Sequence, residues 1–110
     1  MTGLTSHVLD LALGQPARGL AVRLEVPDGA TWRVLARAVT DDDGRAGGLA
    51  AALPAGTYRL AFETGAYFAS TGRASFYPYV EVTFQITATG QHHHVPLLLS
   101  PHGYTTYRGS

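Results

Sequence analysis

Apolar and polar residues alternate along most of this chain, over short segments that end at Gly, Pro or Asp. The clearest segments are residues 57–63 and 79–87, in which every second residue is a large apolar one. Alternation with a period of two places successive side chains on opposite faces of a strand, so one face is apolar and the other polar. The chain is therefore constrained to form antiparallel sheets that pack together through their apolar faces.

The same alternation predicts strands over residues 4–11, 21–26, 31–40 and 92–100, whereas the Ala- and Gly-rich residues 46–52 give a weak strand signal at best. The predicted strands are separated by clusters of Gly, Pro and Asp, which are typical of tight turns. In the third of these strands, one face is expected to carry Trp32, Val34, Ala36 and Ala38.

Residues 65–73 break the pattern and predict one short helix that ends near Gly72. A last strand is expected where Tyr104 and Tyr107 flank two threonines. With 110 residues the chain has room for a single domain, residues 1–110. Seven to eight short strands without intervening helices predict an all-β fold, a two-sheet β-sandwich with one short helix.

The composition excludes several classes of partner. The 8 basic and 8 acidic side chains leave no net charge to attract nucleic acid or an anionic membrane. The chain has no cysteine, which excludes disulfides and zinc sites built from thiolates. No apolar stretch approaches the roughly 20 residues needed to span a bilayer. We therefore expect no nucleic-acid or membrane partner, and a cytoplasmic location, or a periplasmic one if a signal peptide has been removed.

Two of the predicted strands carry apolar residues on both faces. In residues 92–100, Leu98 shares a face with His94, while the opposite face is also apolar, and in residues 4–11 two leucines share a face with His7. Burying a leucine contributes about 1.5 to 3 kcal/mol, which an exposed sheet face would forfeit. We therefore expect the sheet face with His7, His94 and Leu98 to pack against another subunit, most simply about a two-fold axis.

Three side chains are candidates for chemistry: His7 and His94 for proton transfer, and Arg45 for binding substrate. An unperturbed imidazole has a pKa of about 6.5 and exchanges protons near neutrality. If the first and last strands meet, one histidine could deprotonate a water, the other could protonate a leaving nitrogen, and Arg45 could hold a carbonyl. The residues alone leave a simpler alternative open, in which His7 bonds a backbone group and Arg45 pairs with the acidic residues 41–43.

The remaining histidines give weaker signals. His92 and His94 share a strand face and could bind a metal together, but two ligands with no nearby carboxylate are a weak signal for a metal site. His93 faces the other way and is expected to be structural, and His102 is expected to be exposed. Arg108 has the alternative role of stabilising the terminal strand.

Four segments resemble the 5-hydroxyisourate hydrolases, the transthyretin-like enzymes of purine degradation: LTSHVLDLALGQPARGL, ARAVTDDDGR, GTYRLAFETGAYF and HVPLLLSPHGYTTYRGS. In that family the closing residues 107–110, YRGS, separate the hydrolases from transthyretin. In transthyretin a lysine, a glutamate and a threonine take the places of His7, Arg45 and His94. The resemblance spans nearly the whole chain and indicates the enzyme and not the carrier.

The resemblance implies a transthyretin-like two-sheet β-sandwich that hydrolyses 5-hydroxyisourate to 2-oxo-4-hydroxy-4-carboxy-5-ureidoimidazoline in urate degradation, without a cofactor. It implies a homotetramer with its sites at the dimer–dimer interface. The implied catalytic residues are His7, Arg45 and His94, and the implied substrate-binding residues are Arg45, Thr105, Tyr107, Arg108 and Ser110. The alternative is a transthyretin-like small-ligand carrier without catalysis.

Overall fold

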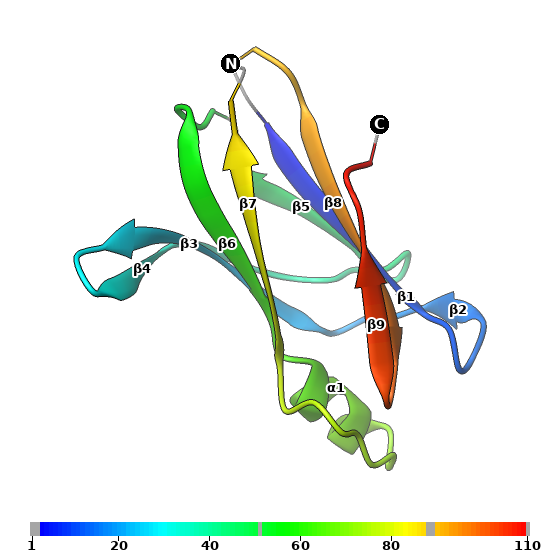
Figure 1. Ribbon diagram of the computed structural model, residues 1–110. Coiled ribbons are helices and arrows are strands. Elements are labelled where there is room, and N and C mark those ends of the chain that lie inside the picture. Colours follow the sequence, from blue (N-terminus) through cyan, green and yellow to red (C-terminus); the bar gives the residue numbers. More distant parts are fainter. Residues whose placement is uncertain (1–2, 51, 88–89, 110) are drawn as a thin grey trace.

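The computed structural model describes residues 3–50, 52–87 and 90–109, and in them two stacked β-sheets and one short helix (Figure 1). The five-stranded sheet contains β1 (Leu4–Asp10), β2 (Gln15–Pro16), β5 (Arg45–Ala50), β8 (His93–Ser100) and β9 (Gly103–Thr106). The four-stranded sheet contains β3 (Ala21–Asp28), β4 (Thr31–Val39), β6 (Gly56–Phe62) and β7 (Val80–Ile86). The helix α1 (Thr64–Ser70) connects β6 to β7. The predicted all-β sandwich with one short helix is confirmed.

The core lies between the two sheets and consists of the apolar residues that alternation turns inward. In the four-stranded sheet Leu60 of β6 pairs with Leu24 of β3 and Val82 of β7. In the five-stranded sheet Val8 of β1 pairs with Leu97 of β8, and both are fully buried. Each buried leucine contributes about 1.5 to 3 kcal/mol, so the two apolar faces hold the sheets together.

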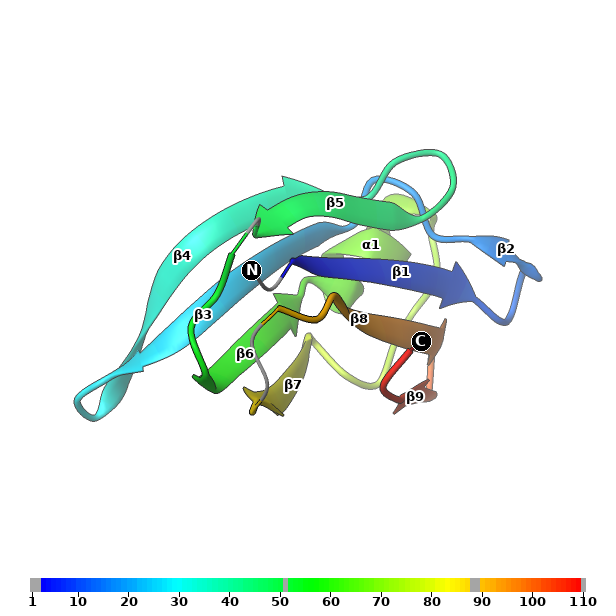
Figure 2. The ribbon, with the colours of Figure 1, turned by 90° about the horizontal axis from the view of Figure 1, so that it is seen from above.

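β1 is the strand around which the five-stranded sheet is arranged. It pairs in parallel with β8, from Leu4 opposite His93 to Asp10 opposite Leu99. On its other side it pairs antiparallel with β5 and with the short β2. Figure 2 shows β1 between β5 and β8. Segments far apart in the sequence therefore supply neighbouring side chains to one sheet face.

Three strands differ from the sequence prediction because pairing outweighs local preference. β5 forms through Arg45–Ala50 although it is rich in Ala and Gly, since its backbone pairs with β1. β2 is a two-residue strand, Gln15–Pro16, that pairs with the end of β1, where the sequence predicted only a turn. β3 continues through Pro27 to Asp28 because β4 pairs with it to the hairpin turn.

The prediction that one face of β4 carries all four alternating residues is wrong. β3 and β4 shift register at Leu35, the extra residue of a β-bulge. Ala36 packs against the core, whereas Trp32 lies beyond the bulge on the outer face of the four-stranded sheet. There the Arg59 guanidinium carbon lies 4.2 Å from the Trp32 ring centroid. One inserted residue reverses every side chain beyond it.

The helix α1 forms where the strand alternation breaks, as predicted, and spans Thr64–Ser70. Its end is set by Gly72, which has φ of 72° and whose N–H donates to the Ala69 carbonyl at 3.0 Å. At the start, the Gly65 N–H donates to the Pro78 carbonyl at 3.0 Å. The helix thereby closes one end of the sandwich.

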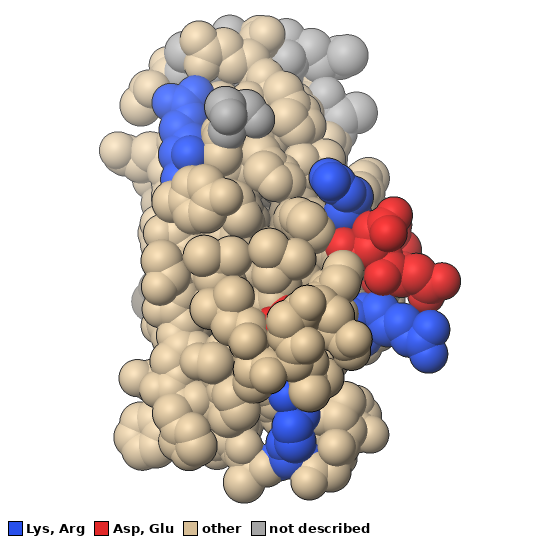
Figure 3. All heavy atoms as spheres, turned by 90° about the vertical axis from the view of Figure 1, so that its right-hand side faces the viewer, with Lys and Arg blue, Asp and Glu red and all other residues tan. Residues whose placement is uncertain are grey.

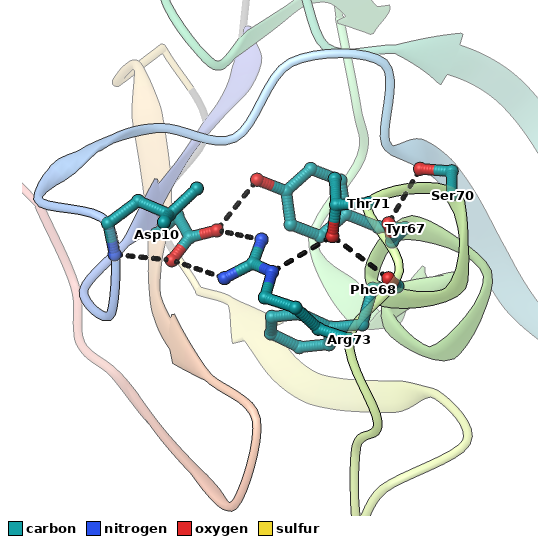
Figure 4. A network of polar contacts seen from close by, with 7 residues as sticks. Asp10, Tyr67, Phe68, Ser70, Thr71 and Arg73 are labelled. Atoms are coloured by element: carbon teal, nitrogen blue, oxygen red, sulfur yellow. Dashed lines mark hydrogen bonds and ion pairs between the residues drawn. The ribbon is translucent and has the colours of Figure 1, made fainter.

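A buried carboxylate joins α1 to the end of β1 (Figure 4). Asp10, which is 0% exposed, accepts hydrogen bonds from the Tyr67 hydroxyl at 2.7 Å, Arg73 Nη2 at 2.6 Å and the Leu13 N–H at 3.1 Å. Burial acts to raise the pKa of Asp10, but the bonds from Arg73, Tyr67 and Leu13 outweigh it, and the pKa lies below its ordinary value of 3.8. The carboxylate therefore stays ionised and holds the β1–β2 loop and the helix to one strand end.

Candidate active site

The site lies on the outer face of the five-stranded sheet, the face turned away from the core. In β1 the inward residues are fully buried, whereas Thr5, His7 and Leu9 point outward and are half-buried. In the parallel register Thr5 pairs with His94 and Leu9 with Leu98, so these side chains are neighbours. The predicted face with His7, His94 and Leu98 exists. Figure 3 shows the side of the molecule on which β1, β8 and β9 lie, with uncharged atoms over its middle and acidic side chains gathered at one edge.

Arg45 is brought to this face by direct pairing with His7. The two residues are opposite each other in the β1–β5 ladder, and neighbouring strands lie about 4.8 Å apart. The Arg45 side chain is exposed, and among the described residues no side chain forms an ion pair or hydrogen bond with its guanidinium. The alternative expectation of an ion pair with residues 41–43 is therefore wrong within the described chain. The guanidinium is free to bind an anionic or carbonyl oxygen.

The acidic turn before Arg45 acts through its backbone. Asp41 Oδ1 accepts hydrogen bonds from the N–H groups of Asp43 at 2.9 Å and Arg45 at 3.0 Å, which fixes the turn. Gly44 has φ of 75°, and a Cβ at this position would clash with the Val8 carbonyl oxygen. The turn therefore requires glycine and lies tightly against β1.

His7 is oriented by this turn. Its Nε2 lies 2.8 Å from the Asp43 carbonyl oxygen. Because a carbonyl only accepts hydrogen bonds, Nε2 carries a proton, and in the neutral ring Nδ1 is the nitrogen that keeps a lone pair. The backbone contact predicted for His7 is confirmed. The same contact orients the ring and selects Nδ1 as its proton acceptor.

His94 is held from two sides. Thr5 Oγ1 lies 2.9 Å from His94 Nδ1, and Gly109 bridges back to β8 through its N–H, which donates to the His94 carbonyl at 2.8 Å. A Cβ on Gly109 would lie 2.6 Å from the imidazole Cδ2, so the glycine packs directly on the ring. The ring is thereby confined between β1 and the C-terminal segment.

The surroundings of His94 favour the neutral imidazole. Burial lowers its pKa below the ordinary value of 6.5, and electrostatic interactions with His7, Arg45 and His92 lower it further, against a hydrogen bond with the Thr5 backbone that raises it. Near pH 7 the ring is therefore uncharged and able to accept a proton.

The predicted substrate-binding residues lie around this face at its C-terminal side. Thr105 of β9 pairs with Leu98, next to the strand that carries His94. Tyr107 and Arg108 line a groove of about 190 Å³ at the open edge between the two sheets, and His94 also borders this groove. Arg108 Nη2 donates to Gln91 Oε1 at 3.0 Å. The predicted role of Ser110 falls outside the described residues.

The other histidines lie where the sequence placed them. His93 is buried, and its Nδ1 lies 3.2 Å from the Gln91 carbonyl, a structural contact. His102 is exposed in the β8–β9 turn. In the part of the chain that the structure describes, no group of three or more His, Cys, Asp or Glu side chains could hold a metal ion. In the same residues no helix is long and apolar enough to cross a membrane.

Comparison with known proteins assigns the fold to a family. The sequence profile of the HIUase/Transthyretin family matches residues 4–109. The chain belongs to this family. It is 53% identical to the 5-hydroxyisourate hydrolase of Mus musculus over 112 residues, which cover 97% of this chain and 94% of the mouse protein. It is 46% identical to the 5-hydroxyisourate hydrolase of Caulobacter vibrioides, with 100% of both chains covered.

Solved structures of the HIUase/transthyretin family include both hydrolases and carriers. The 5-hydroxyisourate hydrolase of Klebsiella pneumoniae superposes with a TM-score of 0.89 at 43% identity, covering 100% of both chains. Sea bream transthyretin in complex with thyroxine superposes with a TM-score of 0.92 at 34% identity, covering 97% of this chain and 94% of the other. The fold is common to both, so the side chains of the site must separate them.

The sequence did not predict the contacts of Thr5 with His92 and His94, or the contact of Gly109 with His94. A signal for the Thr5 contacts was present, because alternation places Thr5 on the face of His7, and His92 on the face of His94. The parallel register that makes them neighbours does not follow from the pattern. The contact of Gly109 depends on the return of the chain after β9, which the sequence pattern does not describe.

Proposed function

We propose that this chain hydrolyses 5-hydroxyisourate to 2-oxo-4-hydroxy-4-carboxy-5-ureidoimidazoline, a step of urate degradation. The observation that carries the proposal is the placement of His7, Arg45 and His94, from three adjacent strands, on one sheet face. Relatives that are 53%, 46% and 43% identical to the chain are named 5-hydroxyisourate hydrolases. The proposed reaction uses side chains and water alone.

Hydrolysis of a cyclic amide requires two proton transfers and one charge to be stabilised. The oxygen of water bonds to the carbonyl carbon while a base removes one of its protons, and negative charge collects on the carbonyl oxygen. The carbon–nitrogen bond then breaks, and the leaving nitrogen receives a proton. The site has two imidazoles for the two transfers and one guanidinium for the charge.

The hydrogen bonds assign an atom to each role. His7 keeps a lone pair on Nδ1, because Nε2–H is donated to the Asp43 carbonyl. His94 bonds Thr5 through Nδ1, and its Nε2 has no hydrogen-bond partner among the described residues. The lowered pKa of His94 keeps this ring neutral near pH 7. His7 Nδ1 or His94 Nε2 can therefore take the proton from water, and the ring that does not act as the base donates a proton to the leaving nitrogen.

Arg45 stabilises the charge on the carbonyl oxygen. A guanidinium is a cation that offers five N–H donors in a fixed plane. In acyl-transfer enzymes, removing one donor to an oxyanion lowers kcat by roughly 10²- to 10³-fold. Thr105, Tyr107 and Arg108 are proposed substrate contacts at the border of the same face.

The experiment generates 5-hydroxyisourate with urate oxidase and follows its ultraviolet decay with and without the protein. Acceleration over spontaneous decay is expected, with kcat lower by roughly 10²- to 10⁴-fold in His7→Ala and in His94→Ala. His102→Ala is the matched control, because His102 is an exposed histidine in the β8–β9 turn. Decay unchanged by the wild-type protein would contradict the function. Full activity in both histidine variants would contradict the proton-transfer roles alone.

Carriage of a small ligand is the second candidate, because the thyroxine-bound transthyretin shares the fold at a TM-score of 0.92. Its site would bind a ligand without turnover. Calorimetric titration with thyroxine together with the decay assay separates the two functions. Tight binding without hydrolysis of 5-hydroxyisourate would favour the carrier, whereas the pair of imidazoles beside Arg45 supports the enzyme.

A homotetramer with its sites at the dimer–dimer interface is part of the proposal. Support comes from the outer face of the five-stranded sheet, where Leu9 and Leu98 are neighbours and only half-buried. The adjacent β1–β2 loop exposes Leu11 and Leu13, which are 55% and 50% exposed. A second copy that covers this face would bury these leucines and enclose the site.

A further inference from the structure

The hydroxyl of Thr5 lies between two imidazoles. Thr5 Oγ1 is 2.9 Å from His92 Nε2 and 2.9 Å from His94 Nδ1. The strand register brings these groups together, because Thr5 of β1 pairs with His94 of β8 and His92 immediately precedes that strand. His92 is exposed and His94 is half-buried. The threonine therefore connects a ring open to solvent with a ring of the candidate active site.

A hydroxyl has one proton, so it can donate to only one of the two rings and must accept from the other. If Thr5 donates to His92, the His94 ring carries its proton on Nδ1 and keeps a lone pair on Nε2. If Thr5 donates to His94, the His94 ring carries its proton on Nε2. The tautomers of the two histidines are thereby linked through one shared oxygen.

We propose that Thr5 and His92 are positioning residues that decide which nitrogen of His94 carries the proton. The proposal rests on the proposed function for its catalytic consequence. With Thr5 donating to His92, Nε2 of His94 can accept a proton from water. With the opposite arrangement, Nε2–H of His94 can give its proton to a leaving nitrogen while Nδ1 takes the proton of the Thr5 hydroxyl and Thr5 takes one from a charged His92, which becomes neutral. One rotation of the hydroxyl proton, with a tautomer change in each ring, therefore turns Nε2 of His94 from a proton acceptor into a proton donor.

Protonation of His92 fixes this choice. A charged imidazole carries protons on both nitrogens, so His92 Nε2–H must then donate to Thr5. Thr5 in turn donates to His94 Nδ1, and the proton of the neutral His94 ring moves to Nε2. In this arrangement His94 is no longer a base at Nε2. A charge on His92 therefore removes the base role of His94 at Nε2 without a charge on His94 itself.

The groups that surround His94 favour its uncharged form. It faces His7 from β1, Arg45 from β5 and His92 from its own segment, and Arg108 of the C-terminal segment borders the same groove. All of these are basic, and the described residues place no carboxylate among them. The pKa of His94 is below its ordinary value, because of burial and these basic neighbours. The His92 ring is exposed to solvent, whereas His94 is half-buried.

The test compares three variants with the wild-type protein. Thr5→Val removes the hydroxyl and keeps the shape of the side chain, Thr5→Ser keeps the hydroxyl, and His92→Gln keeps a hydrogen-bonding side chain that cannot be protonated. Histidine ring ¹⁵N chemical shifts, measured on each folded protein by NMR, report the tautomer of His94 at neutral pH. The kcat/KM for 5-hydroxyisourate is then measured from pH 5 to pH 9.

In the wild-type protein and Thr5→Ser we expect the His94 tautomer to follow the protonation of His92, and in Thr5→Val we expect it to be independent of His92. Thr5→Val should lower kcat by about tenfold with little change in KM, a smaller loss than removal of a proton-transfer group. His92→Gln should move the acid limb of kcat/KM to lower pH.

Two results would overturn the proposal: a His94 tautomer in Thr5→Val identical to that of the wild-type protein at every pH, or an acid limb in His92→Gln that coincides with that of the wild-type protein. The His92 substitution lies on an exposed side chain, so its result stands even if Thr5→Val fails to fold. The NMR comparison does not depend on turnover, and absence of hydrolysis in the wild-type protein would count against the proposed function alone.

Discussion

At the scale of single residues, the contacts around His94 and His7 leave each imidazole one orientation. His94 has Thr5 at 2.9 Å from Nδ1, and Gly109 packed on its Cδ2. His7 is held by the Asp43 carbonyl at 2.8 Å. Misplacement of a reacting group by about 1 Å costs as much as 10²-fold in rate, so small residues that only support the rings are expected to matter for catalysis.

The first prediction concerns Gly109. A methyl group there would lie 2.6 Å from His94 Cδ2 and 3.2 Å from its Cβ, so the ring or the C-terminal segment must move. We expect Gly109→Ala to lower kcat by roughly tenfold to 10²-fold in the 5-hydroxyisourate decay assay. Gly103→Ala is the matched control, because its methyl group would meet nothing closer than Ser100 Oγ at 3.8 Å. Equal activity in the two variants would show that the contact with His94 is unimportant.

A second prediction separates the cost of backbone strain at a glycine from the cost of a steric clash. Gly44 and Gly19 have the same φ of 75°, but only at Gly44 would a Cβ clash with backbone, at the Val8 carbonyl oxygen. Both alanine variants should lose about 1 to 2 kcal/mol of unfolding free energy from strain. Gly44→Ala should lose more, measured by denaturant unfolding, because the turn is pushed away from β1. Similar losses in the two variants would contradict the close contact.

At the scale of elements, β1 joins the parts of the molecule that surround the site. Its outer face carries Thr5 and His7, and its end carries Asp10, which binds α1 and the β1–β2 loop. Arg73 completes the contact from beyond the helix. The position of the strand that carries His7 is therefore coupled to the helix at the end of the sandwich.

The third prediction tests this coupling. Asp10→Asn should lower the unfolding free energy near pH 7 by about 3 kcal/mol, because one partner of a buried pair is lost. The pKa of Asp10 is lowered in the folded state, so its stabilisation is present above about pH 4 and lost as the pH falls through the folded pKa, below 3.8. The difference between the two proteins in chemical denaturation should therefore shrink between pH 4 and pH 2.

The control for this measurement is Asp42→Asn. Asp42 pairs with Arg18 at 3.4 Å, but both side chains are mostly exposed, and pairs of this kind contribute little. No measurable change in stability is expected at either pH. If Asp10→Asn lost as little unfolding free energy as Asp42→Asn, this would contradict the role of the buried carboxylate.

Much of the fold could be predicted from alternation, because burial on one face is recorded in the pattern of strands such as β6 and β7. β5 and β2 could not, since their Ala, Gly, Gln and Pro residues carry no pattern and their pairing is decided by β1. The bulge at Leu35 shows the same limit, because one inserted residue leaves the alternation of the sequence intact while reversing a face.

The sequence predicted which residues form the candidate site and which sheet face carries them, but not the contacts between their side chains. His7, Arg45 and His94 stand out by chemistry and by their match to the hydrolases. Their arrangement depends on the parallel register of β1 and β8, which places Thr5 beside His94. Registers between distant strands are set by the packing of the whole sheet and not by either segment alone.

At the scale of the whole molecule, the outer face of the five-stranded sheet is the surface that would pack against another subunit. The leucines on this face and in the adjacent loop are half-buried or exposed in a single chain, next to the histidines. The single-domain organisation, the assembly and the cytoplasmic location stay predictions. The proposed assembly would bear directly on catalysis, because a partner subunit would separate the site from bulk solvent.

The fourth prediction tests the assembly. In analytical ultracentrifugation at micromolar concentration, the wild-type protein should have about four times the monomer mass of 11.7 kDa. Leu98→Glu should lower this mass and the activity together, because it places a charge on the covered face. Val39→Glu is the control on β4, where the side chain is already 62% exposed, and should change neither. A monomeric wild-type protein with full activity would contradict the tetramer.

The parallel pairing of β1 with β8 also determines when the site can form. Thr5 and His94 are separated by 89 residues, so a chain that emerges from the ribosome at about 5 to 20 residues per second makes β1 roughly 5 to 20 seconds before its partner. During that time β1 has no neighbour on that side, and its backbone is open to pairing with other chains. The edge of β1 that will pair with β8 is thus unprotected until most of the chain has been made.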